Sequence, residues 1–455
     1  MDKWLKAATD YMPQWLDYQM RQSELPGCAV ALAHKGDIVL EAAFGSADLR
    51  QRTRLTPRHR FRVASHSKSF TAAGIMALRE AGTLRLDDPV GRHVTGLHRS
   101  VAAVTLGQLL SHSAGVIRDG TDSGQWQDRR PFLNACELRA ALAAPPTIEA
   151  NTRFKYSNHG YGLLGLVIEA VTGEPYGTWI KRTIVTPAGL RETEPDMPAV
   201  ERGSLASGHS SKLPLGRRVI IPGTNATNAL APATGFVSTA RDLARFFAQL
   251  DPASKRSVLS VASRREMIRA QWRTPQFDLV RHYGLGIASG KVGDWDTFGH
   301  GGSFQGFITA TMAMPGRGLV LAVLTNSSDG LAGPWATGII HILRGFARHG
   351  SPAPRLRDWT GRWWGLWGAL DLLPMGRTVM VATPGFWNPL MDASEISVAA
   401  KDRGRITRAT GFGSFGEDVR LIRGRNRKVV GLQFGGSRLL PEPQVVAEIK
   451  RRYRS

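Results

Sequence analysis

Apolar residues at helical spacing open the chain. They recur every three or four positions from Trp4 to Met20, which predicts an amphipathic helix that Pro13 bends or splits. The apolar run 28–33 and the run 37–41 then flank Lys35-Gly36, and this pattern predicts a β-hairpin. A hairpin packed by a terminal helix indicates an α+β fold.

The next part of the chain, roughly residues 85–250, carries mainly helical signals separated by loops. Thr105 is placed to cap a short helix, and a second helix is expected to stop at Gly173. Residues 239–250 form a further amphipathic pattern, with the apolar side chains on one side. We therefore expect a helical subdomain in this region.

In the stretch that follows, the period of the pattern falls to two, which is typical of strands. Strands are predicted over residues 283–288, 307–314 and 319–324, with Pro315 to Gly318 joining the last two. A closing helix is predicted over residues 335–346.

The segment from Ser351 to Pro354 is the best linker candidate in the chain. Beyond it, four short strand signals are separated by glycine and charge, at residues 379–381, 396–398, 419–422 and 429–434. A basic helix is expected at the end. We therefore divide the chain into a domain of residues 1–350 and a small C-terminal β-sheet or barrel domain of residues 351–455.

Tryptophan is concentrated in residues 359–367. Such a cluster most often fills the core of a β domain, and we adopt that interpretation. Two alternatives stay open. The cluster could cover a substrate cleft, in this chain or in a neighbour, or it could rest on a membrane surface.

The 455 residues carry a formal net charge of +22, which comes mostly from arginine. The arginines are spread over the whole length, and the densest group, 423–428, has no interleaved aromatic residues. This distribution favours a solvated basic surface over nucleic-acid binding.

The two cysteines, Cys28 and Cys136, are expected to be buried free thiols, which suits a reducing compartment. Neither has the spacing of a metal ligand. The first residues lack the apolar core and cleavage site of a secretory signal, and no apolar stretch reaches membrane-spanning length. We therefore expect a cytoplasmic protein.

Candidate chemistry centres on Ser65-His66-Ser67-Lys68. Apolar residues after Lys68 fall at helical spacing until Gly82, so Ser65 and Lys68 lie on one face at the start of a helix. A helix N-terminus favours a serine alkoxide, and a partly desolvated lysine beside it can act as a base. The plainer interpretation is a helix cap followed by a surface lysine.

Tyr156-Ser157-Asn158 comes before a glycine-rich helix start, on a loop that can project into a cleft. A phenol between two cationic groups can have a lowered pKa and can pass a proton to a leaving group. Asn158 could donate to a substrate carbonyl and hold Lys68. A buried tyrosine followed by a helix-capping asparagine is the competing interpretation.

A third segment, His300-Gly301-Gly302-Ser303, comes where the strands begin. Glycines along a strand let a ligand approach the backbone closely. The N–H groups of Ser65 and Ser303 could form an oxyanion hole, and His300 could act as a hydrogen-bond donor or a switchable cation. A turn with a structural histidine is the alternative.

Taken in this order, the three segments resemble the serine β-lactamase/penicillin-binding-protein-like superfamily, and most closely its class C-like branch of esterases, D-aminopeptidases and amide hydrolases. Residues 104–115 and 235–243 add to the resemblance, which covers roughly residues 20–345. It implies an α+β fold, in which an antiparallel sheet flanked by helices adjoins an all-helical subdomain. The tail resembles the β-barrel domains appended to some relatives.

The resemblance also implies an acyl-enzyme route. Ser65 would attack a carbonyl, Lys68 would take its proton, and Tyr156 would protonate the leaving group and later activate water. Asn158 would position the substrate and Lys68, and no metal or other cofactor is implied. No Ser-Asp-Asn triplet stands in place of Tyr156-Ser157-Asn158, which argues against a deacylation driven by glutamate.

One departure from the family pattern bears on the substrate. Many penicillin-recognising members carry a lysine where His300 stands, and a charge-assisted contact to a carboxylate contributes about 1.5–3 kcal/mol. Because histidine is largely neutral near pH 7, we expect a weaker preference for carboxylate-bearing substrates. The loops 118–132 and 204–228 are expected to shape the pocket.

We therefore expect a carboxylesterase or a D-aminopeptidase-like peptidase or amidase, acting on a small ester, amide or short peptide. A β-lactamase or DD-peptidase is the alternative within the family. A non-catalytic binding or assembly protein on the same fold is the rival from another class, and a homo-oligomer stays open.

Overall fold

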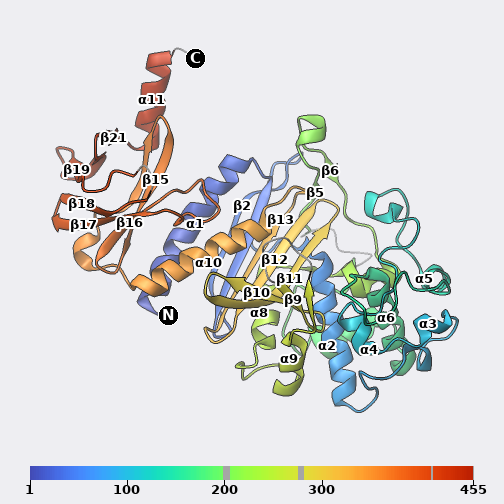
Figure 1. Cartoon of the computed structure of the whole chain (residues 1–455). Coiled ribbons are helices and arrows are strands. Elements are labelled where there is room, and N and C mark those ends of the chain that lie inside the picture. Colours follow the sequence, from blue (N-terminus) through green and yellow to red (C-terminus); the bar gives the residue numbers. More distant parts are fainter. Residues whose placement is uncertain (198–204, 275–280, 411–412, 454–455) are drawn as a thin grey trace. The chain divides into compact units, whose positions relative to one another are not determined.

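The computed structural model of the chain describes residues 1–197, 205–274, 281–410 and 413–453 (Figure 1). These residues divide into two compact units. The larger unit is Leu25–Ala336, and the smaller unit joins Met1–Glu24 to Thr337–Ser455. No helix among the described residues is both long enough and apolar enough to cross a membrane.

Within the described part of the larger unit, nine antiparallel strands form one sheet in the order β3-β2-β1-β13-β12-β11-β10-β9-β8 (Figure 1). The strands are β1 Gly27–His34, β2 Asp37–Asp48, β3 Thr53–Arg54, β8 Trp272–Thr274, β9 Arg281–Tyr283, β10 Ala288–Val292, β11 Trp295–Phe304, β12 Phe307–Met314 and β13 Leu319–Thr325. β1 and β2 form the predicted hairpin, and β12 and β13 confirm two predicted strands. β1 pairs with β13, so the first and last strands of this unit are neighbours.

The strand predicted over residues 283–288 is wrong, because β9 and β10 meet there at a turn. The Gly284 N–H donates to the Ile287 carbonyl at 2.8 Å, and Gly286 has a φ of +69°, a left-handed conformation that ends a strand. The pattern misled because Leu285 and Ile287 are both buried, although they belong to the turn.

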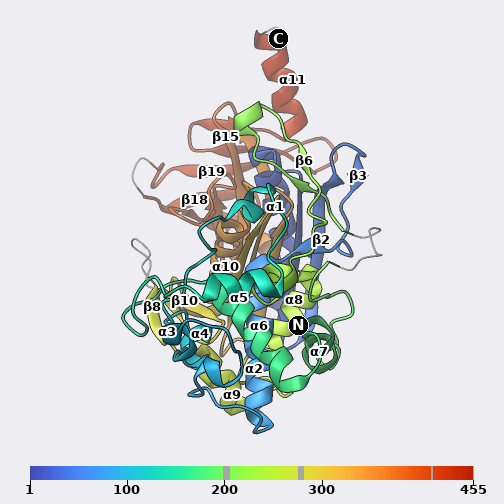
Figure 2. The ribbon, with the colours of Figure 1, turned by 90° about the vertical axis from the view of Figure 1, so that its right-hand side faces the viewer.

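The helices α3, α4, α5 and α6 gather on one side of the sheet, with α2 between them and the strands (Figure 1). Figure 2 looks onto this helical side. The helices of the larger unit are α2 Ser67–Glu80, α3 Arg99–Ala102, α4 Leu106–Leu110, α5 Ala135–Leu142, α6 Asn158–Thr172, α7 Tyr176–Ile180, α8 Ala240–Leu250 and α9 Val261–Ile268. A short strand pair, β5 Gly208–His209 and β6 Ile220–Ile221, lies in a connecting segment.

The predicted helix ends agree with the structure. Thr105 caps α4 in a capping box with Gln108, and Gly173, with a φ of +70°, ends α6. Thr239 caps α8, whose buried Leu243 and Phe247 face the sheet and pack the helix against β1, β12 and β13. The α+β class and the helical subdomain are confirmed.

The smaller unit contains, among its described residues, an eight-stranded antiparallel sheet in which the strands follow chain order. They are β14 Gly361–Gly365, β15 Gly368–Met375, β16 Thr378–Ala382, β17 Ser394–Ala400, β18 Arg403–Arg408, β19 Asp418–Arg423, β20 Val429–Phe434 and β21 Ser437–Leu439. A bridge between Trp364 and Leu440 joins the first and last edges, so the sheet is a nearly closed barrel. β16, β17, β19 and β20 confirm the four strands predicted for the tail.

Three helices complete the described fold: α1 Lys3–Ser23, α10 Ala332–His349, which starts in the larger unit, and the basic α11 Glu442–Tyr453. α1 runs through Pro13 as one helix. The Tyr11 hydroxyl donates to the buried Asp371 carboxylate at 2.7 Å, and Arg362 donates to both oxygens of Asp371 at 2.8 Å. These bonds anchor α1 to β14 and β15, which explains why the first residues belong to the smaller unit, called the barrel unit below.

Two predictions about burial need correction. In the tryptophan cluster, Trp359 and Trp363 are buried in the core of the barrel, as predicted. Trp367, at the tip of the β14–β15 hairpin, is instead 101% exposed. Cys28 is buried as predicted, whereas Cys136 is exposed. The buried residues of α5 are Leu138 and Leu142, and Cys136 lies on the opposite face of that helix.

The edge of β11 packs closely against the segment that carries Ser65. β10 pairs with residues Trp295 to Gly299 of β11. Among the described residues, 300–304 of β11 therefore have no strand partner on the side of β10. A Cβ added at Gly302 would stand 2.3 Å from the Val63 carbonyl oxygen. Only glycine allows this approach.

We predict that Gly302→Ala lowers the free energy of unfolding by about 1–3 kcal/mol, because its Cβ would clash with the Val63 carbonyl. Gly301→Ala is the matched control, since the nearest atom to its added Cβ, the Thr309 carbonyl oxygen, is 3.5 Å away. Urea unfolding measures both variants. Equal stability of the two would contradict the close packing of β11 on this segment.

Candidate active site

Ser65 stands on a short turn between a strand and a helix. β4, Phe61–Arg62, pairs with β7, Val237–Ser238, and leads into the turn η1, Ala64–His66. Ala64 has a φ of +50°, which costs a non-glycine residue about 1–2 kcal/mol, and strain of this kind tends to cluster at functional sites. α2 follows directly, so Lys68 lies in its first turn, as the spacing predicted.

Ser67 holds this turn in place. Its Oγ donates to the Ala64 carbonyl at 2.6 Å and accepts from the Phe236 N–H at 3.0 Å. On α2, Phe70 and Ile75 are fully buried, which fixes the helix against its neighbours. The backbone that presents Ser65 is therefore supported by hydrogen bonds and by packing.

The structure brings four of the predicted residues into one hydrogen-bonded group. The Ser65 Oγ accepts from the Tyr156 hydroxyl at 2.8 Å and from the Lys68 Nζ at 3.2 Å. The Lys68 Nζ also donates to the Asn158 Oδ1 at 2.7 Å and to the Ala233 carbonyl at 2.8 Å. Lys68 is fully buried, so the plainer interpretation of a surface lysine is wrong.

Burial changes the acid–base behaviour of Lys68. Removal from water lowers the pKa of its amine well below the usual value, because the charged form loses its hydration. The positive charge of Arg118 lowers the pKa further, and the negative charge of Asp119 opposes both effects. A neutral amine beside a serine hydroxyl is a competent base.

Ser157, rather than Asn158, caps the helix that follows. The Ser157 Oγ accepts from the Gly160 N–H at 2.9 Å and donates to the Ile117 carbonyl at 2.7 Å. Asn158 is thus free of the capping role, and its side chain turns to Lys68. The competing interpretation of a helix-capping asparagine is therefore wrong.

The expected lowering of the Tyr156 pKa is also wrong. Burial raises the pKa of this phenol, and the hydrogen bond with Ser65 and the charge of Arg118 only partly offset that rise. The sequence does not show that the ring is enclosed, with the His112 ring centroid 4.1 Å away. Tyr156 is therefore a neutral proton donor to Ser65.

His300 is held by the protein through both ring nitrogens. Its Nδ1 lies 2.7 Å from the Gly301 carbonyl, which can only accept, so Nδ1 carries the proton. Its Nε2 then accepts from the Tyr283 hydroxyl at 2.9 Å. Burial, with smaller contributions from the charges of His66 and Lys68, lowers the pKa of His300 to about 3. A neutral histidine results, which does not fit the expected switchable cation.

Gly301, Gly302 and Ser303 lie on the β11 edge that packs against Val63, next to the Ser65 turn. Gly301 and Ser303 are exposed there, so a ligand can reach them. The position of Ser303 agrees with the oxyanion-hole role expected for its N–H, which stays a prediction.

Sequence reasoning missed three residues of this group. Asp119 accepts from the Asn158 Nδ2 at 2.6 Å, and His112 accepts at Nδ1 from the Ser157 N–H at 3.1 Å. Tyr283 is the partner of His300 described above. His112 lies in the 104–115 motif and Asp119 in the 118–132 loop, but no local pattern shows their contacts with residues some 40 positions away.

The two loops that were expected to shape the pocket meet at Gln305, in the β11–β12 turn. The Gln305 Nε2 donates to the Gln125 carbonyl at 2.7 Å, and its Oε1 accepts from the Asn225 Nδ2 at 3.2 Å. Ser204, where the second loop was expected to start, lies outside the described residues. Among the described residues, no three His, Cys, Asp or Glu side chains are placed to hold a metal ion.

An antiparallel sheet with an adjoining helical subdomain, and between them a Ser–Lys–Tyr group whose lysine is fully buried, defines a β-lactamase/transpeptidase-like protein. Comparison with known families agrees: the family described as Beta-lactamase matches residues 12–340, and the chain belongs to this family. The predicted superfamily is thereby confirmed, and the chain is placed among β-lactamase-related hydrolases.

Three similar proteins illustrate the likeness in sequence and in fold. Penicillin-binding protein 4 of Amycolatopsis lactamdurans is 29% identical over 340 residues, which cover 71% of this chain and 86% of the relative. The octameric penicillin-binding protein homologue from Pyrococcus abyssi is similar in fold, with a TM-score of 0.67 at 24% identity over 95% of this chain and 99% of that one. A D-stereospecific amidohydrolase from Streptomyces sp. has a TM-score of 0.59 at 26% identity over 71% and 94% of the two chains.

We predict that the His300 imidazole takes up no proton between pH 5 and 9, because burial lowers its pKa to about 3. NMR titration of the histidine ring resonances measures this, and the spectrum of His300→Gln assigns the His300 signal. A titration midpoint inside that range would contradict the hydrogen bonds assigned to its two nitrogens.

Proposed function

We propose that the chain is a serine hydrolase that cleaves an ester or amide bond through an acyl-enzyme on Ser65. The observation that carries the proposal is the Ser65 Oγ, with the Tyr156 hydroxyl at 2.8 Å and the buried Lys68 amine at 3.2 Å. A nucleophile within hydrogen-bond reach of a base, and a base oriented by a third group, are the parts that acyl transfer requires.

In the first step, the Ser65 Oγ forms a bond to the substrate carbonyl carbon while Lys68 takes its proton. Tyr156 then gives a proton to the leaving oxygen or nitrogen as its bond to carbon breaks, and Lys68 returns a proton to Tyr156. The raised pKa of Tyr156 suits this role, because a neutral phenol keeps the proton until the leaving group needs it. In deacylation, Tyr156 passes its proton to Lys68 and takes one from water as the water oxygen bonds to the acyl carbon. The bond between that carbon and the Ser65 Oγ then breaks, and Lys68 returns the proton to Ser65.

The N–H groups of Ser65 and Ser303 are proposed to stabilise the oxyanion of the tetrahedral intermediate. Asn158 is proposed to hold Lys68 and the substrate. All of these residues belong to the larger unit, so the proposed chemistry rests on residues 25–336. We retain residues 351–455 as an accessory β-rich domain, with no part in bond cleavage.

His300 supports an esterase or amidase over a β-lactamase or DD-peptidase. A lysine at this place would attract a substrate carboxylate, whereas the neutral His300 has both nitrogens engaged with Gly301 and Tyr283. Similarity to a D-stereospecific amidohydrolase supports a D-aminopeptidase-like amidase within this class. We propose small esters, amides or short peptides as substrates, in the cytoplasm.

We predict that Ser65→Ala and Lys68→Ala each reduce hydrolysis of a short-chain p-nitrophenyl ester by at least about a thousandfold. The nucleophile and its base act together, so the loss of either one disables the reaction. Lys291→Ala, at an exposed lysine on β10, is the matched control and keeps wild-type turnover. Circular dichroism checks that each variant is folded.

A substrate panel tests the finer proposal. Esters and D-aminoacyl amides should be cleaved faster than L-aminoacyl amides and nitrocefin. Near wild-type turnover by Ser65→Ala would overturn the acyl-enzyme, and a marked preference for nitrocefin would overturn the assignment against β-lactamase.

A further inference from the structure

The Asn158 amide has a defined orientation, set by the groups on its two sides. Its Oδ1 lies 2.7 Å from the Lys68 Nζ, and its Nδ2 lies 2.6 Å from the Asp119 Oδ1. A carboxylate oxygen can only accept, so it selects the NH₂ side of the amide. The oxygen side is then the one that faces Lys68.

Asp119 is itself held firmly. Its Oδ1 also accepts from the Trp126 Nε1 at 2.9 Å, and its Oδ2 lies 3.0 Å from the Arg118 Nε. The Asp119 side chain is only 15% exposed, whereas that of Arg118 is 65% exposed. The carboxylate therefore has little freedom to turn, and it can hold the amide in one orientation.

We propose that Asp119 is a positioning residue, which orients Asn158 so that its amide oxygen holds the Lys68 amine against Ser65. This inference rests on the proposed function, in which Lys68 is the base. Without the Asp119 carboxylate, the Asn158 amide could turn over and present NH₂ to the amine. Two donors would then face each other whenever Lys68 is protonated.

The charge of Asp119 also acts on Lys68 directly. The ionisable groups that face Lys68 from the elements around it are Asp119, Arg118, His112, His300, Tyr156 and Tyr161. Among them, Asp119 is the group that raises the pKa of Lys68, and Arg118 lowers it. Removal of either charge should therefore move the pKa of Lys68, in opposite directions.

The test compares Asp119→Asn, Asp119→Leu and Arg118→Gln with the control Asp122→Asn, an exposed aspartate of the same loop that pairs with Arg130. Because loss of a negative charge lowers the pKa of Lys68, the acidic limb of kcat/KM should move to lower pH in both Asp119 variants. It should move to higher pH in Arg118→Gln and stay in place in Asp122→Asn. Asp119→Leu, which offers no acceptor to Asn158, should also lose about tenfold to hundredfold in kcat.

A second readout does not depend on turnover. ¹⁵N NMR of the lysine side chains follows the titration of Lys68, whose signal is assigned from Lys68→Arg. An unchanged Lys68 titration in both Asp119 variants, with kcat within twofold of wild type, would overturn the positioning role. If wild-type protein neither turns over nor reacts with a fluorophosphonate at Ser65, the proposed function fails instead, and the titration alone decides on Asp119.

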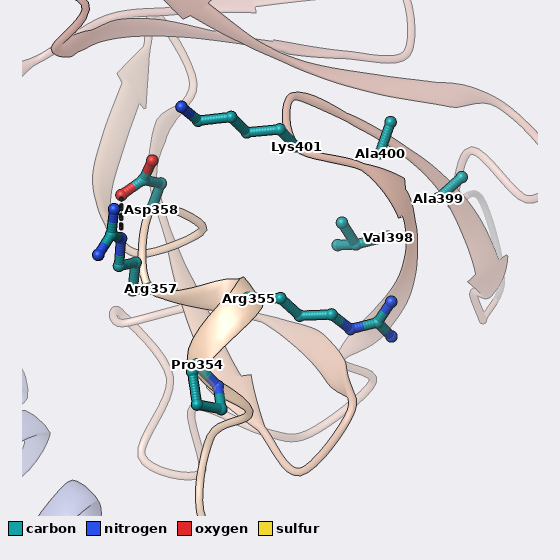
Figure 3. A pocket seen from close by; sticks show the side chains of 8 residues that line it. All are labelled: Pro354, Arg355, Arg357, Asp358, Val398, Ala399, Ala400 and Lys401. Carbon is teal, nitrogen blue, oxygen red and sulfur yellow. Dashed lines mark ion pairs between the residues drawn. The ribbon is translucent and has the colours of Figure 1, made fainter.

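The barrel unit contains a hollow lined by basic side chains. This hollow, of about 580 Å³, lies next to the end of β17 (Figure 3). Its other side is formed by the turn η8, Pro354–Leu356, and the two residues that follow this turn. Its lining contains three cations, one acid and an apolar wall: Arg355, Arg357, Lys401, Asp358, Val398, Ala399, Ala400 and Pro354. The volume is in the range of small-molecule sites.

The walls of this hollow are fixed, and its acid is neutralised. Leu356 and Trp359 are fully buried, and the Trp359 Nε1 donates to the Lys401 carbonyl at 3.0 Å, which ties the two walls together. The Asp358 carboxylate accepts a hydrogen bond from the Arg423 Nη2 at 2.8 Å. In the part of the chain that the structure describes, neither Arg355 nor Lys401 has an ion-pair partner within 4.0 Å, and Figure 3 shows them on opposite sides of the opening.

We propose that this hollow binds a small organic anion, with phosphate or carboxylate groups reaching Arg355 and Lys401 and an apolar part against the β17 wall. Such a group could arrive as a free metabolite or as a lipid headgroup. The inference does not depend on the proposed hydrolase activity.

The test measures binding of pyrophosphate and citrate by calorimetry at low salt, and of phosphatidylglycerol vesicles by co-sedimentation. Arg355→Ala/Lys401→Ala should weaken binding at least about fivefold. The control Arg425→Ala/Lys428→Ala removes equal charge from the exposed β19–β20 turn and should bind like wild type. Binding of the soluble anions alone identifies a metabolite site, and binding of vesicles alone a headgroup site. No binding, or equal weakening in both double variants, would overturn the proposal.

Discussion

The site depends on one costly arrangement, which is the full burial of the Lys68 amine next to Ser65. A buried ammonium without partners is strongly disfavoured, so the fold surrounds Nζ with acceptors: the Asn158 amide, the Ala233 carbonyl and the Ser65 Oγ. Burial lowers the pKa of Lys68, and these contacts keep the amine in position once it is neutral. A lysine on the surface would have neither property.

The remaining architecture serves to hold this arrangement. Ser67 ties the turn before α2 to its neighbours, and Gly302 lets the β11 edge approach the Val63 carbonyl. Asp119 supports the lysine from the loop side through Asn158. The barrel unit has its own core and its own anchor to α1 at Asp371, so the fold of the barrel does not draw on the site.

Much of the fold and the main residues of the site could be predicted from the sequence, because their signals are local. The Ser65–Lys68 spacing, the Thr105 and Gly173 helix ends and the period-two runs each lie within a few residues. The errors about the site share a cause, since they depend on contacts between distant segments. The raised pKa of Tyr156 comes from its enclosure, the neutral His300 from its burial, and the role of Asp119 from a contact 39 residues along the chain.

The central claim is that Ser65 forms a covalent intermediate with the substrate. Its most direct test is mass spectrometry of protein quenched with acid during turnover of a p-nitrophenyl ester, followed by peptide mapping. The account predicts one acyl group on the peptide that contains Ser65, and none in Lys68→Ala quenched at the same time. Continued hydrolysis with an unmodified Ser65 peptide, or an acyl group on another residue, would contradict it.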